Sequence, residues 1–188
     1  GTWIQGDLKD IFKNALVQNT DWHSVIHNIA FNDNDIRPLL DIPKAKHLVL
    51  NSTVSVYRYS PKPQTPYTED QVDHSFRPLD EKLEDIHWKY SKGKVEAESA
   101  LISSGRPFTI LRPTIVFGVN DVAKRTQWYV DRILKGEKIM FDTPTTNRFS
   151  LVSNVDAGKA FALVAAKHPP GIYNLAGNEA LTLGGFVE

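Results

Sequence analysis

Short apolar runs alternate with stretches of helical periodicity along the chain. The apolar runs predict strands at residues 24–30, 48–52, 108–112 and 148–152. The periodic stretches predict helices at residues 8–19, 84–103, 122–134 and 155–166, the last with Asn154 as its N-cap. Strands that alternate with helices in this way are typical of an α/β fold with a parallel sheet.

The two connections that flank the second strand are unusual. Residues 35–40 form a brief polar crossover, where parallel strands are usually joined by a longer helix. After the strand, Pro61, Pro63 and Pro66 predict an irregular loop, because a proline has no N–H donor and restricts the residue before it. We expect this loop at the surface, near the mouth of a substrate site.

Composition adds few constraints. A chain of 188 residues can bury one substantial core, and its 22 basic and 22 acidic residues cancel, so no broad attraction to nucleic acid or membrane is encoded. The absence of cysteine excludes disulfides and thiolate metal sites, and no apolar run is long enough to cross a bilayer. The six histidines are scattered along the chain, and we expect none of them to be a metal ligand. These features are typical of a cytoplasmic enzyme.

The most informative chemistry is a tyrosine followed four places later by a lysine. Tyr90 and Lys94 fall in the predicted helix at 84–103, where this spacing puts both side chains on one face. A phenol titrates near pH 10 in water, and a neighbouring ammonium lowers this pKa by favouring the phenolate. The pair is therefore a candidate acid/base device, although the same spacing also occurs in helices as a half-buried aromatic beside a solvated lysine.

A cluster of hydroxyls follows the second predicted strand. Thr53 comes two residues after Asn51 and four before Tyr57, at the end of the strand, where open α/β sheets place their chemistry. Thr53 is a candidate to hold a substrate oxygen. The alternative is a strand-end hydroxyl that hydrogen-bonds to the backbone.

These features stand in a fixed order with several further short motifs. Together they resemble the extended short-chain dehydrogenase/reductases, the family of NAD-dependent nucleotide-sugar epimerases and dehydratases. The resemblance covers nearly the whole chain and depends on these segments: Gly6-Asp7-Leu8, Val25-Ile-His-Asn-Ile-Ala30, Ser52-Thr53-x-x-Val56-Tyr57, Tyr90-x-x-x-Lys94, Leu111-Arg-Pro113, Phe117-Gly118, Arg148-Phe-x-x-Val152 and Gly171-Ile-Tyr-Asn-Leu175.

The resemblance implies a Rossmann-like fold and a role for each matched residue, with NAD or NADP as the cofactor. Tyr90 would be the general acid/base, Lys94 would assist it and bind the nicotinamide ribose, and Thr53 would hold the substrate oxygen. The remaining cofactor contacts would be Asp7 and Leu8 at the adenine, Asn28, Ile29 and Ala30 at the middle of the cofactor, and Pro113 and Thr114 at the nicotinamide.

One part of the family pattern is absent. The sequence contains no Gly-x-x-Gly-x-x-Gly turn, which in the family holds the cofactor pyrophosphate at a helix N-terminus. Residues 1–7 resemble the third strand of the family, so we expect an internal fragment of a longer protein. Residues 1–118 would then be a partial Rossmann-like NAD(P)-binding domain, and residues 119–188 a partial substrate-binding lobe. A homodimer is among the expected partners, although the short crossover argues against a dimer contact through that segment.

In the predicted substrate-binding lobe, Arg148 begins a strand. The resemblance implies that it contacts the diphosphate of a nucleotide-sugar, a task that suits a guanidinium. The alternative is a surface ion pair with Asp142 or Asp156. A phosphate site would need a second cation, for which Arg125 and Arg132 are the candidates; Trp128 and Tyr129 are expected to pack in the core.

Two classes of function remain open. The first is an NAD(P)-dependent epimerase or reductase that acts on a nucleotide-sugar or a related hydroxyl or carbonyl substrate. Dehydratases of the family carry an acidic pair directly after the catalytic Thr, where this chain has Val54-Ser55, which argues against dehydration. The second is a non-catalytic or RNA-binding relative, since chloroplast members with a similar compact pattern bind RNA. The neutral charge argues against nucleic acid, because phosphate binding needs a basic stripe.

Overall fold

The chain divides into two compact units. The computed structural model describes residues 1–75 and 85–187, with every side chain except that of Lys9. The first unit contains Gly1–Arg112 and Phe161–Asn174, and the second contains Pro113–Ala160 and Leu175–Glu188. The chain therefore leaves the first unit at residue 112, before the boundary expected at 118, and later returns to it.

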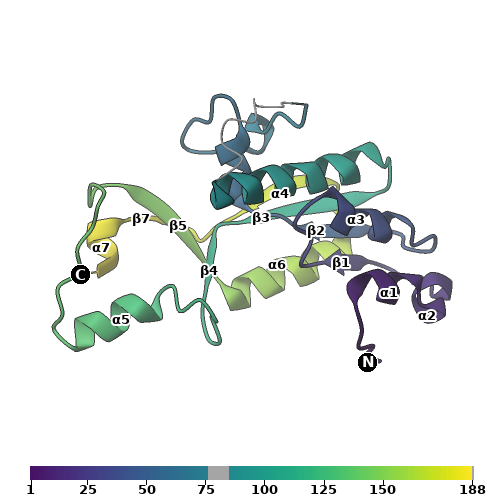
Figure 1. The fold of residues 1–188 in the computed structure, drawn as a ribbon, viewed down its shortest axis with the longest axis horizontal. Coiled ribbons are helices and arrows are strands. Elements are labelled where there is room, and N and C mark those ends of the chain that lie inside the picture. Colours follow the sequence, from purple (N-terminus) through teal and green to yellow (C-terminus); the bar gives the residue numbers. More distant parts are fainter. Residues whose placement is uncertain (76–84, 188) are drawn as a thin grey trace. The chain divides into compact units, whose positions relative to one another are not determined.

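The first unit is built on a parallel sheet (Figure 1). Its strands are β1, β2, β3 and β6, at Val25–His27, Leu48–Asn51, Phe108–Pro113 and Gly171–Leu175. Their order in space is β1-β2-β3-β6, and β2 pairs in parallel with both β1 and β3. The predicted α/β fold with a Rossmann-like parallel sheet is thus confirmed.

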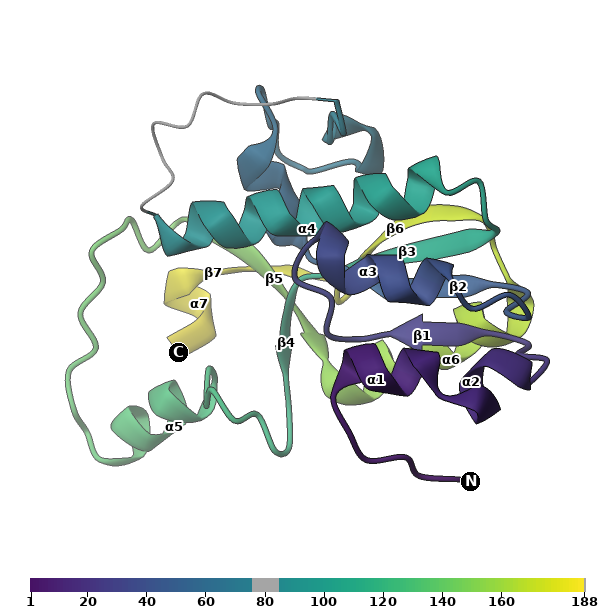
Figure 2. The same cartoon turned by 45° about the vertical axis from the view of Figure 1, so that its right-hand side comes forward.

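Two helices cover one face of this sheet. Helix α3, at Asp33–Leu40, connects β1 to β2, and helix α4, at Ile86–Ser103, precedes β3; the two lie side by side (Figure 2). The predicted end of α4 at Ser103 is confirmed, while its predicted start near Glu84 lies outside the described residues. The apolar residues that these elements share in the core are Ile36, Leu39, Leu48, Leu50, Ala97, Leu101 and Ile110. No helix in the described ranges has the length and hydropathy needed to cross a bilayer.

The short crossover between β1 and β2 is the eight-residue helix α3. Asn32 caps it, since its side-chain oxygen accepts hydrogen bonds from the backbone N–H groups of Asn34, at 2.9 Å, and Asp35, at 3.3 Å. The carboxylate of Asp35 in turn accepts from the N–H of Asn32, which completes a capping box. This reciprocal cap fixes the chain at the carboxyl end of β1.

The N-terminal segment differs from the prediction in two ways. A single helix over 8–19 was wrong: α1 (Leu8–Lys13) and α2 (Ala15–Asn19) are separated by Asn14, whose side-chain oxygen accepts from the N–H of Leu16 at 2.9 Å and starts a new helix. The strand expected at residues 1–7 was also wrong. A strand needs a neighbouring backbone to pair with, and no strand of the described chain pairs with this segment.

The second unit contains a small mixed sheet. Its strands are β4, β5 and β7, at Ile115–Phe117, Arg148–Ser153 and Ala180–Thr182. The central strand β5 is parallel to β4 and antiparallel to β7. Helices α5 and α7, at Gln127–Leu134 and Leu183–Val187, belong to this unit; helix α6, at Asn154–Lys167, starts in it and ends in the first unit.

Helix α5 starts five residues later than the predicted start at residue 122. The carboxylate of Asp121 accepts hydrogen bonds from the N–H groups of Ala123, at 3.2 Å, and Arg125, at 2.9 Å. These bonds hold residues 121–125 in a turn, which competes with the helical pattern.

The N-cap of α6 is Ser153, and the prediction of Asn154 was wrong. The Ser153 hydroxyl accepts from the N–H of Asp156 at 3.0 Å. The Asn154 amide instead donates to the carbonyl of Val119 at 2.9 Å. This arrangement requires glycine at position 118, which has a φ of +144° and where a Cβ would overlap the Asn154 side chain.

Candidate active site

Helix α4 carries the predicted tyrosine–lysine pair on one face. Asp85 starts the helix by accepting hydrogen bonds from the N–H groups of His87, at 2.8 Å, and Trp88, at 3.4 Å. One and two turns further, Tyr90 and Lys94 lie together, with the ammonium nitrogen of Lys94 5.7 Å from the centre of the Tyr90 ring. The structure thus brings together the two residues that the sequence singled out.

The ammonium of Lys94 lies at the carboxyl end of β2. Its Nζ donates a hydrogen bond to the backbone carbonyl of Asn51 at 3.1 Å, and its side chain is only 4% exposed. Among the described residues this carbonyl is its one hydrogen-bond acceptor, so two of the three N–H groups remain for a ligand. An ammonium with unused donors, held at the edge where α/β sheets bind their ligands, is suited to binding hydroxyl groups.

Burial lowers the pKa of Lys94 from 10.5 to about 8. The charged form is disfavoured because it is removed from water, and the nearby carboxylates of Glu98 and Asp35 oppose this effect only in part. Lys94 is therefore mainly protonated at neutral pH, yet its pKa lies close enough to neutrality for it to take part in proton exchange.

Thr53 lies two residues beyond the carbonyl that binds Lys94. It caps the 3₁₀ helix η1, at Val54–Tyr59: its hydroxyl oxygen accepts from the N–H of Ser55 at 3.2 Å. The hydroxyl also donates to the Ser55 hydroxyl at 3.3 Å, a long bond that a better acceptor could replace. The backbone contact expected of a strand-end hydroxyl is therefore present, and the proton of Thr53 remains accessible to a substrate oxygen.

The cofactor-binding residues predicted around β1 and β2 occupy the same edge of the sheet. Asn28, Ile29 and Ala30 directly follow β1, and the Asn51 amide donates to the side-chain oxygen of Asn28 at 2.6 Å, which ties the two strand ends together. The side-chain oxygen of Asn51 is buried and has no hydrogen-bond partner within the described part of the chain. A buried acceptor without a partner is costly, so this edge fits a polar ligand such as a dinucleotide.

The other residues predicted to contact the cofactor are Pro113, Thr114, Asp7 and Leu8. Pro113 is the last residue of β3, and Thr114 follows it with a buried hydroxyl that has no partner among residues 1–75 and 85–187. Asp7 precedes α1 and is exposed, whereas Leu8 packs against the main core. The leucine side chain is thus partly buried by packing against the core, while that of Asp7 is open to solvent.

A buried ion pair fixes α4 to the sheet, and the sequence reasoning did not find it. Both Glu98 and Arg112 are fully buried, and the guanidinium binds the carboxylate with two hydrogen bonds, at 2.7 and 3.0 Å. Ser52 and His74 also donate to this carboxylate. Burial would raise the pKa of Glu98, but the hydrogen bonds from His74, Arg112 and Ser52 and the charge of Arg112 outweigh it and lower the pKa.

The same arginine connects the ion pair to the loops that follow β2. Its Nη1 donates to the Tyr57 hydroxyl at 3.1 Å and to the carbonyl of Glu69 at 2.9 Å, in the 3₁₀ helix η2 at Glu69–Gln71. The Tyr57 hydroxyl donates in turn to Asn174 in β6 at 2.7 Å. The sequence signal was present, since Glu98 follows Lys94 by four residues and therefore shares its helical face.

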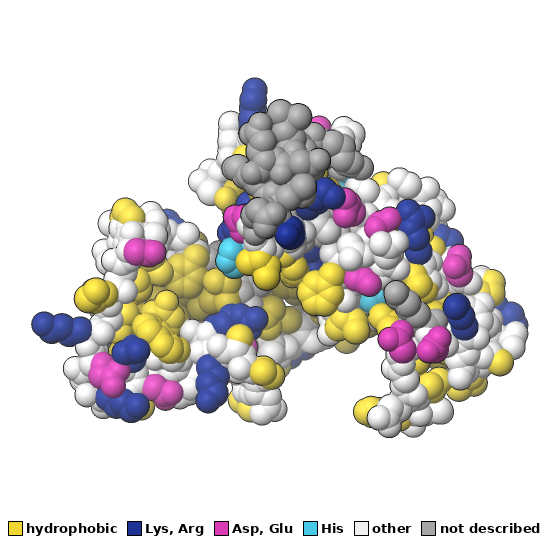
Figure 3. All heavy atoms as spheres, in the orientation of Figure 1, with side chains coloured by type: hydrophobic (Ala, Val, Ile, Leu, Met, Phe, Trp, Pro, Cys, Tyr) yellow, Lys and Arg dark blue, Asp and Glu magenta, His cyan; other side chains and the backbone are white. Residues whose placement is uncertain are grey.

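The second unit has a cavity of about 470 Å³ with a largely apolar lining. Apolar side chains gather in this hollow beside α5 and α7 (Figure 3). Tyr129, expected in the core, lines the cavity and packs edge to face against Phe186 at 5.1 Å, whereas Trp128 is half-exposed. The residues that line the cavity are Ile115, Arg125, Thr126, Tyr129, Asn147, Arg148, Phe149, Leu151, Leu183 and Phe186.

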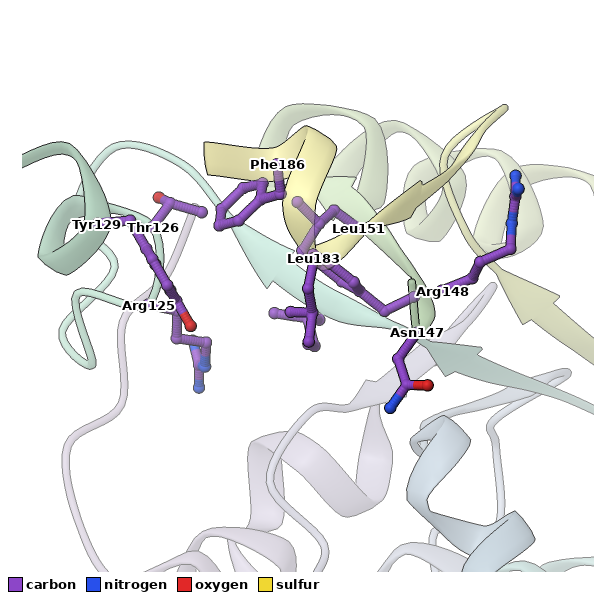
Figure 4. A pocket seen from close by; sticks show the side chains of 10 residues that line it. Arg125, Thr126, Tyr129, Asn147, Arg148, Leu151, Leu183 and Phe186 are labelled. Atoms are coloured by element: carbon purple, nitrogen blue, oxygen red, sulfur yellow. The ribbon is translucent and has the colours of Figure 1, made fainter. Parts of the chain in front are cut away.

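The predicted phosphate-binding arginines do not converge. Arg148 donates to the carbonyl of Ala180 in β7 at 2.8 Å, and no ion pair of Arg148 is formed within the described residues. Its guanidinium points away from Leu183 and Phe186 (Figure 4). Of the two candidate second cations, Arg125 lines the same cavity but is paired with Asp121 at 2.7 Å. Arg132 lies outside the lining, paired with Glu137 at 2.7 Å and stacked on Trp128 at 4.3 Å.

Comparisons with known proteins place these features in a family. The NAD dependent epimerase/dehydratase family matches residues 36–176, a span that includes Thr53, Tyr90 and Lys94. The chain is also 26% identical to the chloroplast stem-loop binding protein of 41 kDa b of Arabidopsis thaliana, over 98% of this chain and 46% of that protein.

Solved structures show the same fold. WbmH of Bordetella bronchiseptica, in complex with NAD⁺, matches with a TM-score of 0.71 and 18% identity, over 97% of this chain and 62% of that one. The dTDP-glucose 4,6-dehydratase of Bacillus anthracis, in complex with NAD, gives 0.70 and 18%, over 98% and 61%. The UDP-N-acetylglucosamine 4-epimerase of Methanobrevibacter ruminantium, in complex with UDP-N-acetylmuramic acid, gives 0.63 and 20%, over 95% and 60%.

This chain thus spans about 60% of these solved structures and less than half of the plant protein. The family match covers well over half of the chain, and the family is described as NAD dependent. This match decides which family the chain is assigned to. The chain belongs to the NAD dependent epimerase/dehydratase family.

Proposed function

We propose that this chain carries the catalytic residues of an NAD(P)-dependent epimerase or reductase that acts on a nucleotide-sugar or a related hydroxyl or carbonyl substrate. The observation that carries the proposal is the buried Lys94 ammonium, which lies beside Tyr90 and hydrogen-bonds the carbonyl at the end of β2. A merely structural lysine would extend its charge into water.

Each residue of the site has a distinct part in the proposed reaction. Tyr90 removes a proton from a substrate hydroxyl, or returns one to a carbonyl, and the ammonium of Lys94 stabilises the phenolate that forms. The two unused N–H groups of Lys94 would hold the hydroxyls of the nicotinamide ribose. Thr53 donates its hydroxyl proton to the same substrate oxygen and thereby orients it. The chemistry that a bound NAD would supply is hydride transfer.

The substrate class is supported by the relatives. Solved structures of the same fold include a UDP-N-acetylglucosamine 4-epimerase and a dTDP-glucose 4,6-dehydratase. In this chain Val54-Ser55 stand where dehydratases carry an acidic pair after the catalytic Thr, which favours epimerisation or reduction over dehydration. The contact of Arg148 with a diphosphate is part of the proposal and requires the guanidinium to exchange the Ala180 carbonyl for phosphate oxygens.

The test is turnover by the Tyr90→Phe variant of the protein that carries this chain. UDP- and dTDP-sugars are incubated with NAD⁺ or NADP⁺, and the products are identified by NMR. We expect turnover to fall by about two to four orders of magnitude with cofactor affinity nearly unchanged, because only the acid/base hydroxyl is lost. Tyr173→Phe removes an exposed hydroxyl that bonds the carbonyl of Pro170 and serves as the matched control. Wild-type turnover in Tyr90→Phe would refute the assignment.

A second candidate is an RNA-binding relative without catalysis. It is favoured by the 26% identity to a protein named for stem-loop binding. The equal numbers of basic and acidic residues argue against it, since binding to phosphate backbones depends on basic side chains. Titration of the protein with an RNA stem-loop at two salt concentrations separates the classes: salt-sensitive binding that Tyr90→Phe and Lys94→Ala leave unchanged, without any turnover, would favour this candidate.

A further inference from the structure

Phe31, at the carboxyl end of β1, is held in place by its backbone. Its N–H donates to the carboxylate of Asp35 at 2.8 Å, and the same carboxylate accepts from the N–H of Asn32 at 3.3 Å. Because Asp35 is the third residue of α3 and closes its capping box, the position of Phe31 is coupled to that of the helix.

The other side of this turn packs directly on α4. A Cβ at Gly93 would overlap the carbonyl oxygen of Phe31, so the two backbones are in contact without a side chain between them. Gly93 precedes Lys94 and follows Tyr90 by three residues. The contact therefore fixes Phe31 relative to both members of the pair.

The ring of Phe31 contacts both of these residues. It meets the Tyr90 ring edge to face, with centroids 6.1 Å apart and an interplanar angle of 62°. Its centroid lies 5.6 Å from the ammonium nitrogen of Lys94, and the Tyr90 centroid lies 5.7 Å from the same nitrogen, so the two rings and the ammonium form a triangle of mutual contacts. Phe31 itself is 58% exposed, whereas Lys94 is 4% exposed. An apolar ring thus lies in solvent while the cation beside it is buried.

We propose that Phe31 is a positioning residue of the site, whose ring forms the solvent-side wall of the Lys94 ammonium and, together with the adjacent Tyr90 ring, keeps the ammonium on the Asn51 carbonyl. The catalytic part of this role rests on the proposed function. The physical part, a wall that keeps water from Lys94, does not depend on it.

The charged and titratable groups around Lys94 come from three elements. Asp35 in α3 and Glu98 in α4 favour its charged form, and His27 in β1 lies close enough to interact with it electrostatically. Burial is the largest effect on the pKa of Lys94 and lowers it. The Phe31 ring, which is exposed and lies beside the ammonium, is the neighbour placed to contribute to that burial from the solvent side. The attraction between the ring and the cation acts in the opposite direction, but at 5.6 Å it is near the outer limit of about 6 Å for such contacts, so desolvation prevails.

The test measures the pKa of Lys94 in the whole chain, without substrate or cofactor. Reductive methylation by limiting formaldehyde is followed by mass spectrometry from neutral to alkaline pH in the wild type and in Phe31→Ala. We expect an apparent pKa of about 8 in the wild type and a rise of at least about one pH unit in Phe31→Ala, because water reaches the ammonium. Phe31→Tyr keeps the ring and should restore the wild-type value. Ile86→Ala, which removes an exposed side chain from the same helix, should leave it unchanged.

An unchanged pKa in Phe31→Ala, or a rise in Phe31→Tyr as large as that in Phe31→Ala, would overturn the proposal. Either result would leave the proposed function intact, since that is tested by the turnover of Tyr90→Phe. If the turnover experiment refuted the proposed function, the methylation experiment would still measure whether Phe31 keeps water from Lys94.

Discussion

Replacing Lys94 by methionine should change the pH dependence of the unfolding free energy by an amount that follows from the lowered pKa of Lys94. Burial lowers the pKa of Lys94 from 10.5 to about 8. Since one pH unit corresponds to 1.36 kcal/mol, this difference of about 2.5 units equals about 3 kcal/mol. Methionine has a similar length and no charge, so it removes this cost together with the hydrogen bond to the Asn51 carbonyl.

The sign follows from proton binding in the two states. Below pH 8 both the folded and the unfolded chain carry the Lys94 proton, and the folded state bears the full cost of its burial. Between about pH 8 and 10.5 the folded state releases the proton first, so the unfolded state binds more protons and the wild type gains stability as the pH rises. The stability of Lys94→Met relative to the wild type should therefore fall by about 3 kcal/mol between neutral pH and pH 10.5.

Urea denaturation of both proteins at neutral pH and near pH 10.5 measures this change. Comparison of the two proteins at each pH cancels the titration of all other groups. Lys89→Met, an exposed lysine of the same helix, is the control, and its difference from the wild type should stay within about 0.5 kcal/mol at both values. A stability difference for Lys94→Met that does not vary with pH would refute the reasoning, because it would mean that the folded chain keeps Lys94 in a water-like environment.

Three further predictions concern the packing of α4. Glu98→Gln should cost about 3–5 kcal/mol of unfolding free energy, because it leaves Arg112 buried without a counter-charge. Glu96→Gln, which removes a partly exposed ion pair with Lys92 in the same helix, should cost less than about 1 kcal/mol; equal losses in urea denaturation would contradict this. Since the folded-state pKa of Glu98 lies below its unfolded value of 4.5, its contribution is present above pH 4.5 and is lost as the pH falls further, so acidification should destabilise the wild type more than Glu98→Gln. Gly93→Ala should destabilise by about 1–3 kcal/mol through overlap with Phe31, although alanine is the better helix former by about 1 kcal/mol; a more stable variant would show that the turn can move away.

Much of the fold could be predicted because the strands of a parallel sheet are buried on both faces. The runs at β2 and β3 are mainly apolar, with Asn51, Thr109 and Arg112 as their polar positions, and such runs predict buried strands. The errors fall where a single side chain competes with a periodic pattern. Asn14 divides a predicted helix and Asp121 delays another, in each case by accepting backbone N–H groups within two to four residues.

The candidate site divides in a similar way. Tyr90 and Lys94 were predictable because four residues of helix bring them together, which is a local rule. The hydrogen bond from Lys94 to the Asn51 carbonyl and the contact with Phe31 were not, since they join segments more than forty residues apart. The spacing of residues along the sequence cannot predict such contacts, because they depend on the order of the strands in the sheet.

Contacts among the histidines, at the opposite end of the strands, also could not be predicted from spacing. Three of them come together from distant parts of the sequence: the His168 ring stacks on His47 with centroids 4.6 Å apart and packs at a tilt of 34° against His23 at 4.2 Å. Burial lowers the pKa of His47, and the charges of His168 and His23 lower it further. Within the described chain, no group of three or more metal-ligating residues has the geometry to hold an ion.

One face of α4 combines the chemistry and its mechanical support. Tyr90, Lys94 and Glu98 recur every four residues, and Glu98 is locked to β3 by the two hydrogen bonds from Arg112. A helix held by a buried bidentate contact cannot rotate or slide without breaking it, so the ammonium one turn away keeps its place on the Asn51 carbonyl. The buried ion pair thus helps to keep a second buried cation, Lys94, in its place in the site. Loss of Glu98 should therefore impair the Tyr90–Lys94 pair even in conditions where the chain remains folded.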